Sequence, residues 1–204
     1  MDSIGRAIGG ASGVVPIRVD APGVEPVSLA EMRGYLRLDP DAGDEDALVA
    51  SLIQAARAAV ERATGRLLAP GRYRLALTAW PAGGVLPLPL SPLVGLAHAG
   101  VVDAEGSVTD LAPGLVRVGP DPWEAPCLLV GAGAPALARA AALIEVVAGC
   151  GGDGPPVPAP LAQAVRMAVA QWFENRGDAA DPASAGALPA AVAGLIAPYR
   201  RLRL

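Results

Sequence analysis

The chain has 204 residues, no lysine among its 16 basic residues and a formal net charge of −4, and 52% of it is hydrophobic although only 3% is aromatic. This length suffices for one domain with an aliphatic core, and we expect one domain with arms. The acidic balance argues against a protein that wraps nucleic acid, because neutralising phosphates requires clustered positive charge, but it permits a channel along which a polyanion slides.

The first part of the chain, residues 1–27, is rich in Gly, Pro and Ser and shows no apolar period. We expect it to form an N-terminal arm that packs on the body of the protein or on a neighbour. It lacks the uninterrupted apolar stretch of a signal peptide, and no window of about 18 apolar residues free of charge follows it. These features predict cytoplasmic synthesis and no membrane association.

A short helix is predicted over residues 29–37 from the signals at its start. Ser28 and Glu31 form an S-x-x-E capping box, in which the side chain of each residue accepts a hydrogen bond from the backbone of the other. Val27 and Met32 occupy the positions of a hydrophobic staple around that cap.

An acidic loop, LDPDAGDED, precedes the second predicted helix at residues 44–64. Its oxygen ligands would suit calcium, but the EF-hand spacing is absent. We favour the alternative in which Asp44, Glu45 and Asp46 cap the helix and interact with its positive N-terminal dipole, while Gly65 provides its C-terminal stop. An i, i+3, i+4, i+7 apolar stripe marks the face that should be buried. It comprises Leu48, Val49, Leu52, Ile53, Ala56, Val60 and Ala63.

Between residues 72 and 147 the pattern changes to short apolar runs bounded by Gly and Pro. These runs predict β-strands, and the DAEG sequence after Val102 predicts a hairpin turn. Strands and helices do not alternate, so a doubly wound sheet is not expected, and the glycine cluster near Gly131 has no following helix. The predicted strand segments are YRLALTAW, VLPLPL, LAHAGVVD, LVRVG, CLLVGA and ALIEVVAG.

Two further helices are predicted, one at residues 160–176 with Pro160 near its first turn, and one at residues 189–197 that is stopped by Pro198. The expected fold class is therefore α+β. It consists of a helical body of about four helices and a β-rich middle section, which together form a single domain at residues 28–198.

The sequence WFENR at the end of the third predicted helix indicates either a functional site or a packing corner. Trp172 and Phe173 continue an apolar stripe, so we expect both rings to be buried. Arg176 would interact with the negative end of the helix dipole, and Glu174 or Asn175 would tie the following loop. Catalysis would need a second titratable partner, for which the sequence offers no convincing candidate, so we interpret WFENR as a structural corner.

No catalytic or metal site is predicted from the residues. His98, the only histidine, lies in a β-patterned run, and no G-x-S-x-G surrounds any serine. A small-molecule hydrolase or binding protein that pairs His98 with a carboxylate is kept as the alternative function. Cys127 and Cys150 lack C-x-x-C spacing and form no recognisable zinc site. Neither a P-loop nor an HExxH motif occurs, so no cofactor is expected.

The C-terminal tail, residues 199–204, ends in RRLRL. In one interpretation the tail is simply solvated, and in a second it binds nucleic acid, which the lack of aromatic or Gly-rich context disfavours. In a third, the guanidinium groups pair with carboxylates of a partner while the leucines fill a groove. The residues alone leave solvation and docking equally open. The candidate docking residues are Tyr199, Arg200, Arg201, Leu202, Arg203 and Leu204.

The order of these segments, from about Ser28 to Arg201, resembles the head-to-tail connector or adaptor proteins of long-tailed phages, prophages and gene transfer agents. The most specific parts are SLAEMRGYLRLD, the A-R-x-x-V-E-x-x-T-G segment at residues 56–65 and the WFENR helix end. The Trp-Pro pair at Trp80 and Pro81 and the closing LPAAVAGLIAPYRRLRL fit the same pattern.

The resemblance implies a structural, non-enzymatic protein that forms an oligomeric ring, commonly twelve-fold, beneath the portal protein. Such a ring joins the capsid to the tail, contacts a tail-side stopper or tail-terminator protein, and forms part of the DNA channel without sequence-specific binding. The C-terminal segment commonly reaches the portal, so residues 199–204 are the expected docking tail. Assembly would occur in the cytoplasm of a bacterial host, followed by incorporation at the head-tail junction of a virion or gene-transfer-agent particle.

Overall fold

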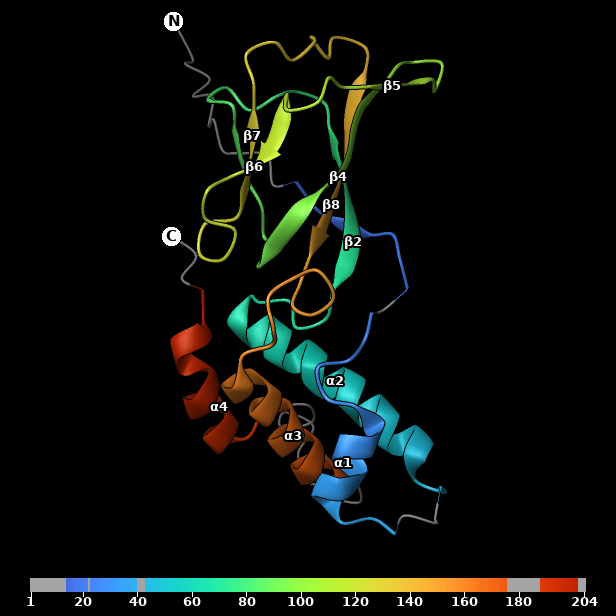
Figure 1. Cartoon of the computed structure of the whole chain (residues 1–204), viewed down its shortest axis with the longest axis vertical. Coiled ribbons are helices and arrows are strands. Elements are labelled where there is room, and N and C mark those ends of the chain that lie inside the picture. The colour runs from blue at the N-terminus through green and yellow to red at the C-terminus, as the bar shows by residue number, and fades with distance from the viewer. Residues whose placement is uncertain (1–13, 22, 40–42, 176–187, 202–204) are drawn as a thin grey trace, which may run out of the picture.

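The computed structural model describes residues 14–21, 23–39, 43–175 and 188–201. Over these residues it has an α+β fold, with the helices packed together at one end and two antiparallel sheets at the other (Figure 1). The helices are α1 Leu29–Leu36, α2 Asp46–Thr64, α3 Ala159–Glu174 and α4 Ala190–Ile196, and a 3-10 turn, η1 Ala197–Tyr199, follows α4. The expected fold class is confirmed.

The two sheets are formed by the β-patterned middle of the chain together with one strand from the N-terminal segment. The five-stranded sheet has the order β1-β2-β8-β4-β5, and the three-stranded sheet has the order β3-β7-β6. The strands are β1 Ile17–Arg18, β2 Gly71–Leu77, β3 Val85–Pro87, β4 Leu93–Val102, β5 Val108–Asp110, β6 Val116–Val118, β7 Cys127–Val130 and β8 Ala141–Ala148.

The helical end is held together by an apolar core to which all four helices contribute. Residues of α2 and α3 that recur at helical spacing lie on the buried faces, as their amphipathic patterns predict. Burial of these aliphatic faces removes apolar surface from water and is the main source of stability at this end. The fully buried members include Val49, Ala56, Val60, Leu161, Ala164, Val165, Ala168 and Val169.

The capping box at the start of α1 is confirmed. The Glu31 backbone N–H donates to Ser28 Oγ at 3.2 Å, and the Ser28 backbone N–H donates to Glu31 Oε2 at 2.8 Å. Val27 and Met32, the predicted staple residues, are both fully buried in the helical core. Two otherwise unpaired backbone donors are thus satisfied where the helix begins.

Replacing Ser28 with Ala should lower the free energy of unfolding by about 1 kcal/mol, because the N–H of Glu31 loses its acceptor at the helix start. Chemical denaturation of the variant and the unmodified chain would measure the difference. A Ser28→Thr variant, which keeps the hydroxyl, serves as the control. Equal stability of the Ala variant and the unmodified chain would contradict a stabilising role for this cap.

The same cap should make this helix start sensitive to acid. The Ser28 backbone N–H and hydroxyl, together with Arg166, lower the pKa of Glu31 below its ordinary value. A carboxyl whose pKa is lowered by folding stabilises the protein above its unfolded-state pKa, and this contribution is lost as the pH falls through the folded-state pKa. The stability difference between the unmodified chain and Ser28→Ala should therefore narrow below a pH of about 4. Unfolding curves recorded across that range would test it.

The start of α2 differs from the prediction. Glu45 is the N-cap residue but makes no side-chain capping hydrogen bond, and the helix begins at Asp46 rather than at residue 44. Asp46 instead receives two hydrogen bonds from Arg33 Nη1, at 2.8 and 2.9 Å, which link α1 to α2. The predicted capping by these side chains is therefore wrong, since the first-turn carboxylate is used for an ion pair. Residues 40–42 of the acidic loop lie outside the described residues.

The end of α2 is as predicted. Gly65 is the C-cap, with a left-handed φ of 70°, and its N–H donates to the Glu61 carbonyl. Glycine adopts this conformation without the steric penalty that a Cβ would impose. The chain then turns through residues 66–70 into β2, which connects the helical end to the sheets.

The long strands of the five-stranded sheet alternate between the two faces of the sheet. In β2 every second residue from Gly71 to Leu77 is buried, and β8 shows the same alternation. The antiparallel register pairs Leu75 with Ile144 and Tyr73 with Val146, so the buried side chains lie on one face. The expected DAEG hairpin is confirmed, because Val102 pairs with Val108 and Gly106 at the turn has φ of 85°.

The described part of the predicted N-terminal arm lies on the body. β1 pairs with β2, and Arg18 Nη2 donates to the Pro70 carbonyl at 2.7 Å. This strand was not predicted, because two residues give no detectable alternation. The arm therefore contributes an edge strand to the sheet, and residues 1–13 lie outside the described part of the chain.

Candidate functional site

The described part of the C-terminal tail lies where the helical end meets the sheets. The Arg201 N–H donates to the Thr64 carbonyl, at the end of α2, at 2.9 Å. The Tyr199 carbonyl accepts a hydrogen bond from Arg66 Nε at 3.1 Å. The base of the tail is therefore attached to the protein through its backbone, whereas residues 202–204 lie outside the described residues.

Arg66 is the centre of this attachment. Of the charged residues in the described part of the chain it is the single buried one, only 3% exposed, and its guanidinium bonds three separate segments. Nη1 donates to Ser91 Oγ at 3.0 Å and to the Trp123 carbonyl at 2.6 Å. Nη2 donates to both carboxylate oxygens of Glu124, at 2.7 and 2.8 Å. This bidentate pair satisfies a buried charge that would otherwise be strongly destabilising.

The indole of Trp123 adds a further contact to this guanidinium. The Arg66 Cζ lies 4.7 Å from the ring centroid, within the range of a cation–π interaction. Ser91 Oγ in turn donates to the Trp123 carbonyl at 2.6 Å. Ser91, Trp123 and Arg66 therefore form one connected polar network at the junction of the helices and the sheets.

A tight turn in the loop between β6 and β7 presents Glu124 to Arg66. Asp121 Oδ1 accepts hydrogen bonds from the backbone N–H groups of Trp123 and Glu124, at 3.2 and 2.8 Å. These N–H groups, the Glu124 N–H most strongly, lower the pKa of Asp121. Such an aspartate-stabilised turn fixes the local backbone around Glu124, and the pairing with Arg66 then relates this turn to the rest of the protein.

The structure describes Trp172, Phe173, Glu174 and Asn175 of the predicted structural corner. Trp172 and Phe173 are half-buried and pack against the helical core, rather than being enclosed by it. α3 ends at Glu174, earlier than expected, and the Asn175 side chain donates back to the Gln171 carbonyl at 2.9 Å, while the loop that Glu174 or Asn175 was expected to tie lies outside the described residues. Arg176 lies outside the described residues.

Replacing Trp172 with Ala should lower the free energy of unfolding by about 2 kcal/mol, less than the loss of about 3–5 kcal/mol expected for a fully buried ring. The reason is that the indole is only partly buried, so part of its surface is already in contact with water. Thermal unfolding would measure the loss, with Trp172→Phe as the control that keeps an aromatic contact. A loss above 5 kcal/mol in the Ala variant would show that the ring is more deeply packed than described.

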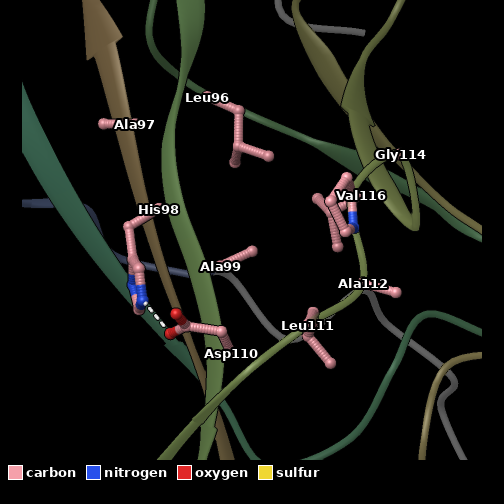
Figure 2. Close-up of a pocket in the computed structure, with 10 residues that line it drawn as sticks. Leu96, Ala97, His98, Ala99, Asp110, Leu111, Ala112, Gly114 and Val116 are labelled. Carbon is pink, nitrogen blue, oxygen red and sulfur yellow. Dashed lines mark hydrogen bonds and ion pairs between the residues drawn. The ribbon is translucent and has the colours of Figure 1, made fainter.

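His98 forms a pair with a carboxylate on the outer part of the five-stranded sheet. Its Nε2 lies 2.8 Å from Asp110 Oδ1, and Figure 2 shows the two side chains pointing toward one another. They line a surface pocket of about 210 Å³, whose other lining residues are Leu96, Ala97, Ala99, Leu111, Ala112, Pro113, Gly114 and Val116. None of these carries a hydroxyl or thiol that His98 could activate, so the geometry gives no support to the hydrolase alternative.

The two cysteines and the potential metal ligands form no further site among the described residues. Cys127 and Cys150 are free, and burial raises the pKa of the Cys150 thiol to about 11. Across the described residues no three metal-ligating side chains are grouped. None of the helices in the described part of the chain is both long and apolar enough to cross a bilayer.

Neither a protein-family model nor a curated protein matches the chain. Solved structures do match it. In the neck of an empty gene transfer agent (GTA) particle computed with C6 symmetry, one chain is 34% identical with a TM-score of 0.77, and the alignment covers 93% of this chain and 97% of that one. The chain belongs to the head-to-tail connector family.

Two further particle structures agree with this identification of the connector. The virion of a native gene transfer agent particle contains a chain 36% identical to the connector, with a TM-score of 0.75 and coverage of 93% and 96%. The neck of a native particle computed with C12 symmetry contains one that is 32% identical, with a TM-score of 0.71 and coverage of 93% and 97%. The resemblance seen in the sequence is confirmed, and the connector is a structural head-tail adaptor.

The network around Arg66 was not predicted from the sequence of the connector. Arg66 follows the helix stop at Gly65 and has no motif around it. Its partners Glu124 and Tyr199 lie 58 and 133 residues further along the chain. Only the low frequency of fully buried arginines makes such a residue notable, and burial becomes visible only in the folded structure.

Proposed function

We propose that the connector forms a twelve-fold ring that docks beneath the portal protein of its particle through the C-terminal tail, residues 199–204. The observation that supports this most is the likeness, over 93% of the chain, to a component of a gene transfer agent neck computed with C12 symmetry. In a closed ring each subunit uses two different surfaces for its neighbours.

The attachment of the tail base supports the docking role. Arg201 is held to the end of α2 by its backbone, and Tyr199 by Arg66, so the last residues start from a defined point. A tail that leaves a rigid base loses less conformational freedom on binding than one that leaves a flexible segment. The arginines and leucines at its end suit a partner groove that is lined by carboxylates and apolar side chains.

The rest of the proposed role follows from the position of the ring. The lumen would form part of the DNA channel, where the net charge of −4 disfavours tight binding to the passing DNA. The other side of the ring would contact a stopper or tail-terminator protein. We propose assembly in the cytoplasm of a bacterial host, incorporation into a gene-transfer-agent or phage particle, and no catalytic activity.

The test is capture of the connector by its own portal ring, followed by imaging of the complex for rotational symmetry. The full chain is compared with a truncation that ends at Arg201, so that the described structure is retained. The expected result is a twelve-fold ring with the full chain and at least a tenfold weaker interaction with the truncation. A Leu202→Ser/Leu204→Ser variant separates the apolar contribution from that of the arginines.

Two outcomes would overturn parts of this proposal. Equal binding by the truncated and full chains would exclude residues 202–204, the end of the tail, as the docking element. A ring with another number of subunits would exclude the twelve-fold assembly while leaving the docking role intact.

A further inference from the structure

We propose that Arg66 is a positioning residue of the docking end, and that the loop at residues 119–126, which it holds against the tail, is part of the surface that meets the portal. This inference rests on the proposed docking of the tail to the portal. It adds the acidic loop to that surface. It also makes the buried Arg66 the residue that fixes the position of the loop relative to the tail.

A single guanidinium bonds both elements. Arg66 Nε donates to the Tyr199 carbonyl in the tail at 3.1 Å, while Nη2 donates to the Glu124 carboxylate in the loop at 2.7 and 2.8 Å. The guanidinium is planar and its donors have fixed directions. The tail base and the loop are therefore held at a distance and orientation that the arginine geometry sets.

A second contact joins the same two elements without Arg66. Arg201 Nη2 donates to the Glu124 carbonyl at 3.4 Å, and the Arg201 N–H is bonded to Thr64 at the end of α2. In Figure 1 the last described residues lie beside the loop that connects β6 and β7. The tail and this loop are thus neighbours in space although they are far apart in the sequence.

Several residues of the loop are exposed to solvent, although Glu124 pairs with the buried Arg66. The Glu124 side chain remains 62% exposed while it pairs with the 3%-exposed Arg66. Pro120, Asp121, Pro122 and Ala125 are also exposed. The loop therefore presents carboxylates next to the arginines of the tail. A portal surface with basic groups opposite the loop and acidic groups opposite the tail would match this pair by charge.

A purely stabilising role does not account for this arrangement well. Burying an arginine and pairing it with a carboxylate carries a desolvation cost, so such pairs add little net stability compared with apolar residues of similar size. The network instead imposes a unique relative position on segments 58 and 133 residues away from Arg66. Segments held in one relative position form a preorganised binding surface, which loses less conformational entropy when the partner binds.

The first experiment measures the affinity of the folded full-length connector for its portal ring. Arg66→Met removes all the guanidinium hydrogen bonds, Arg66→Lys keeps the charge without the fork, and Ala125→Arg changes the exposed loop without touching the network. We expect binding to weaken about tenfold or more for Arg66→Met and Ala125→Arg, and to an intermediate degree for Arg66→Lys. Arg33→Met, which breaks the ion pair between α1 and α2, is the matched control and should bind as the unmodified chain does.

The second experiment measures the distance between the loop and the tail base directly. Spin labels at Ala125→Cys and Arg200→Cys, in a chain whose Cys127 and Cys150 are replaced by Ser and Ala, report the distance between loop and tail base. The distribution should be narrow in this labelled chain and clearly broader when Arg66→Met is added. A role in global stability alone would leave the distribution in the folded fraction unchanged.

The outcomes separate this inference from the proposed function. If the truncation after Arg201 binds the portal like the full chain, docking through residues 202–204 fails, whatever Arg66 does. If that truncation loses binding while Arg66→Met keeps unmodified affinity, only the positioning role fails. If Arg66→Met does not fold, Ala125→Arg decides, because unmodified affinity in that variant would exclude the loop from the docking surface.

Discussion

Replacing Glu61 with Ala should lower the free energy of unfolding by about 3 kcal/mol, among the largest effects expected from a single side chain outside the apolar cores. Glu61 Oε1 accepts hydrogen bonds from the N–H groups of Leu68 and Ala69, at 2.7 and 3.3 Å. Its Oε2 accepts one from Arg57 at 2.8 Å. The substitution leaves two buried backbone donors without this acceptor and removes one of the two carboxylates that pair with Arg57.

Chemical denaturation would measure this loss, and Glu61→Gln is the matched control. Glutamine keeps an oxygen that can accept from Leu68 and Ala69 but removes the charge that pairs with Arg57. We expect the Gln variant to lose about half as much as the Ala variant. If the two variants are equally stable, the backbone hydrogen bonds make no contribution of their own.

Leu161→Ala in α3 and Ile144→Ala in β8 should each lower the free energy of unfolding by about 2–5 kcal/mol. Both side chains are fully buried, and they belong to two different apolar clusters, one among the helices and one between the sheets. Removing three heavy atoms from a close-packed core loses both the transfer free energy and the contacts around the new cavity.

The variants Leu161→Ala and Ile144→Ala also test the prediction that residues 28–198 form a single domain. If the two clusters unfold together, each variant shifts one common transition when it is followed by helical and by sheet signals. Two separate transitions, each shifted by only one of the variants, would contradict a single cooperative domain. Ala162→Gly in α3 and Ala142→Gly in β8 are unsuitable as controls, because glycine also increases the conformational freedom of the backbone. Leu161→Met and Ile144→Leu, which nearly conserve volume, are the appropriate ones.

Elements with strong local signals were predicted well. The capping box at Ser28 and Glu31, the left-handed stop at Gly65 and the hairpin turn after Val102 each depend on residues that are neighbours in the chain. Errors occurred where a local signal competed with a distant partner. Asp46 was expected to cap α2 and instead pairs with Arg33, and the rings of Trp172 and Phe173 meet the edge of the core rather than its interior.

The sequence by itself determined the α+β class, the four helices, most of the strands and the connector family, because these depend on period, capping and the order of segments along the chain. Only the tertiary structure decided where Arg66 lies and what it holds together. Its partners Ser91, Glu124 and Tyr199 are 25, 58 and 133 residues away, and they meet it only after α2, the β6–β7 loop and the tail have packed. Hydrogen bonds between residues so far apart in the sequence produce no recognisable sequence pattern, because packing of the folded elements sets their geometry and neighbouring residues do not.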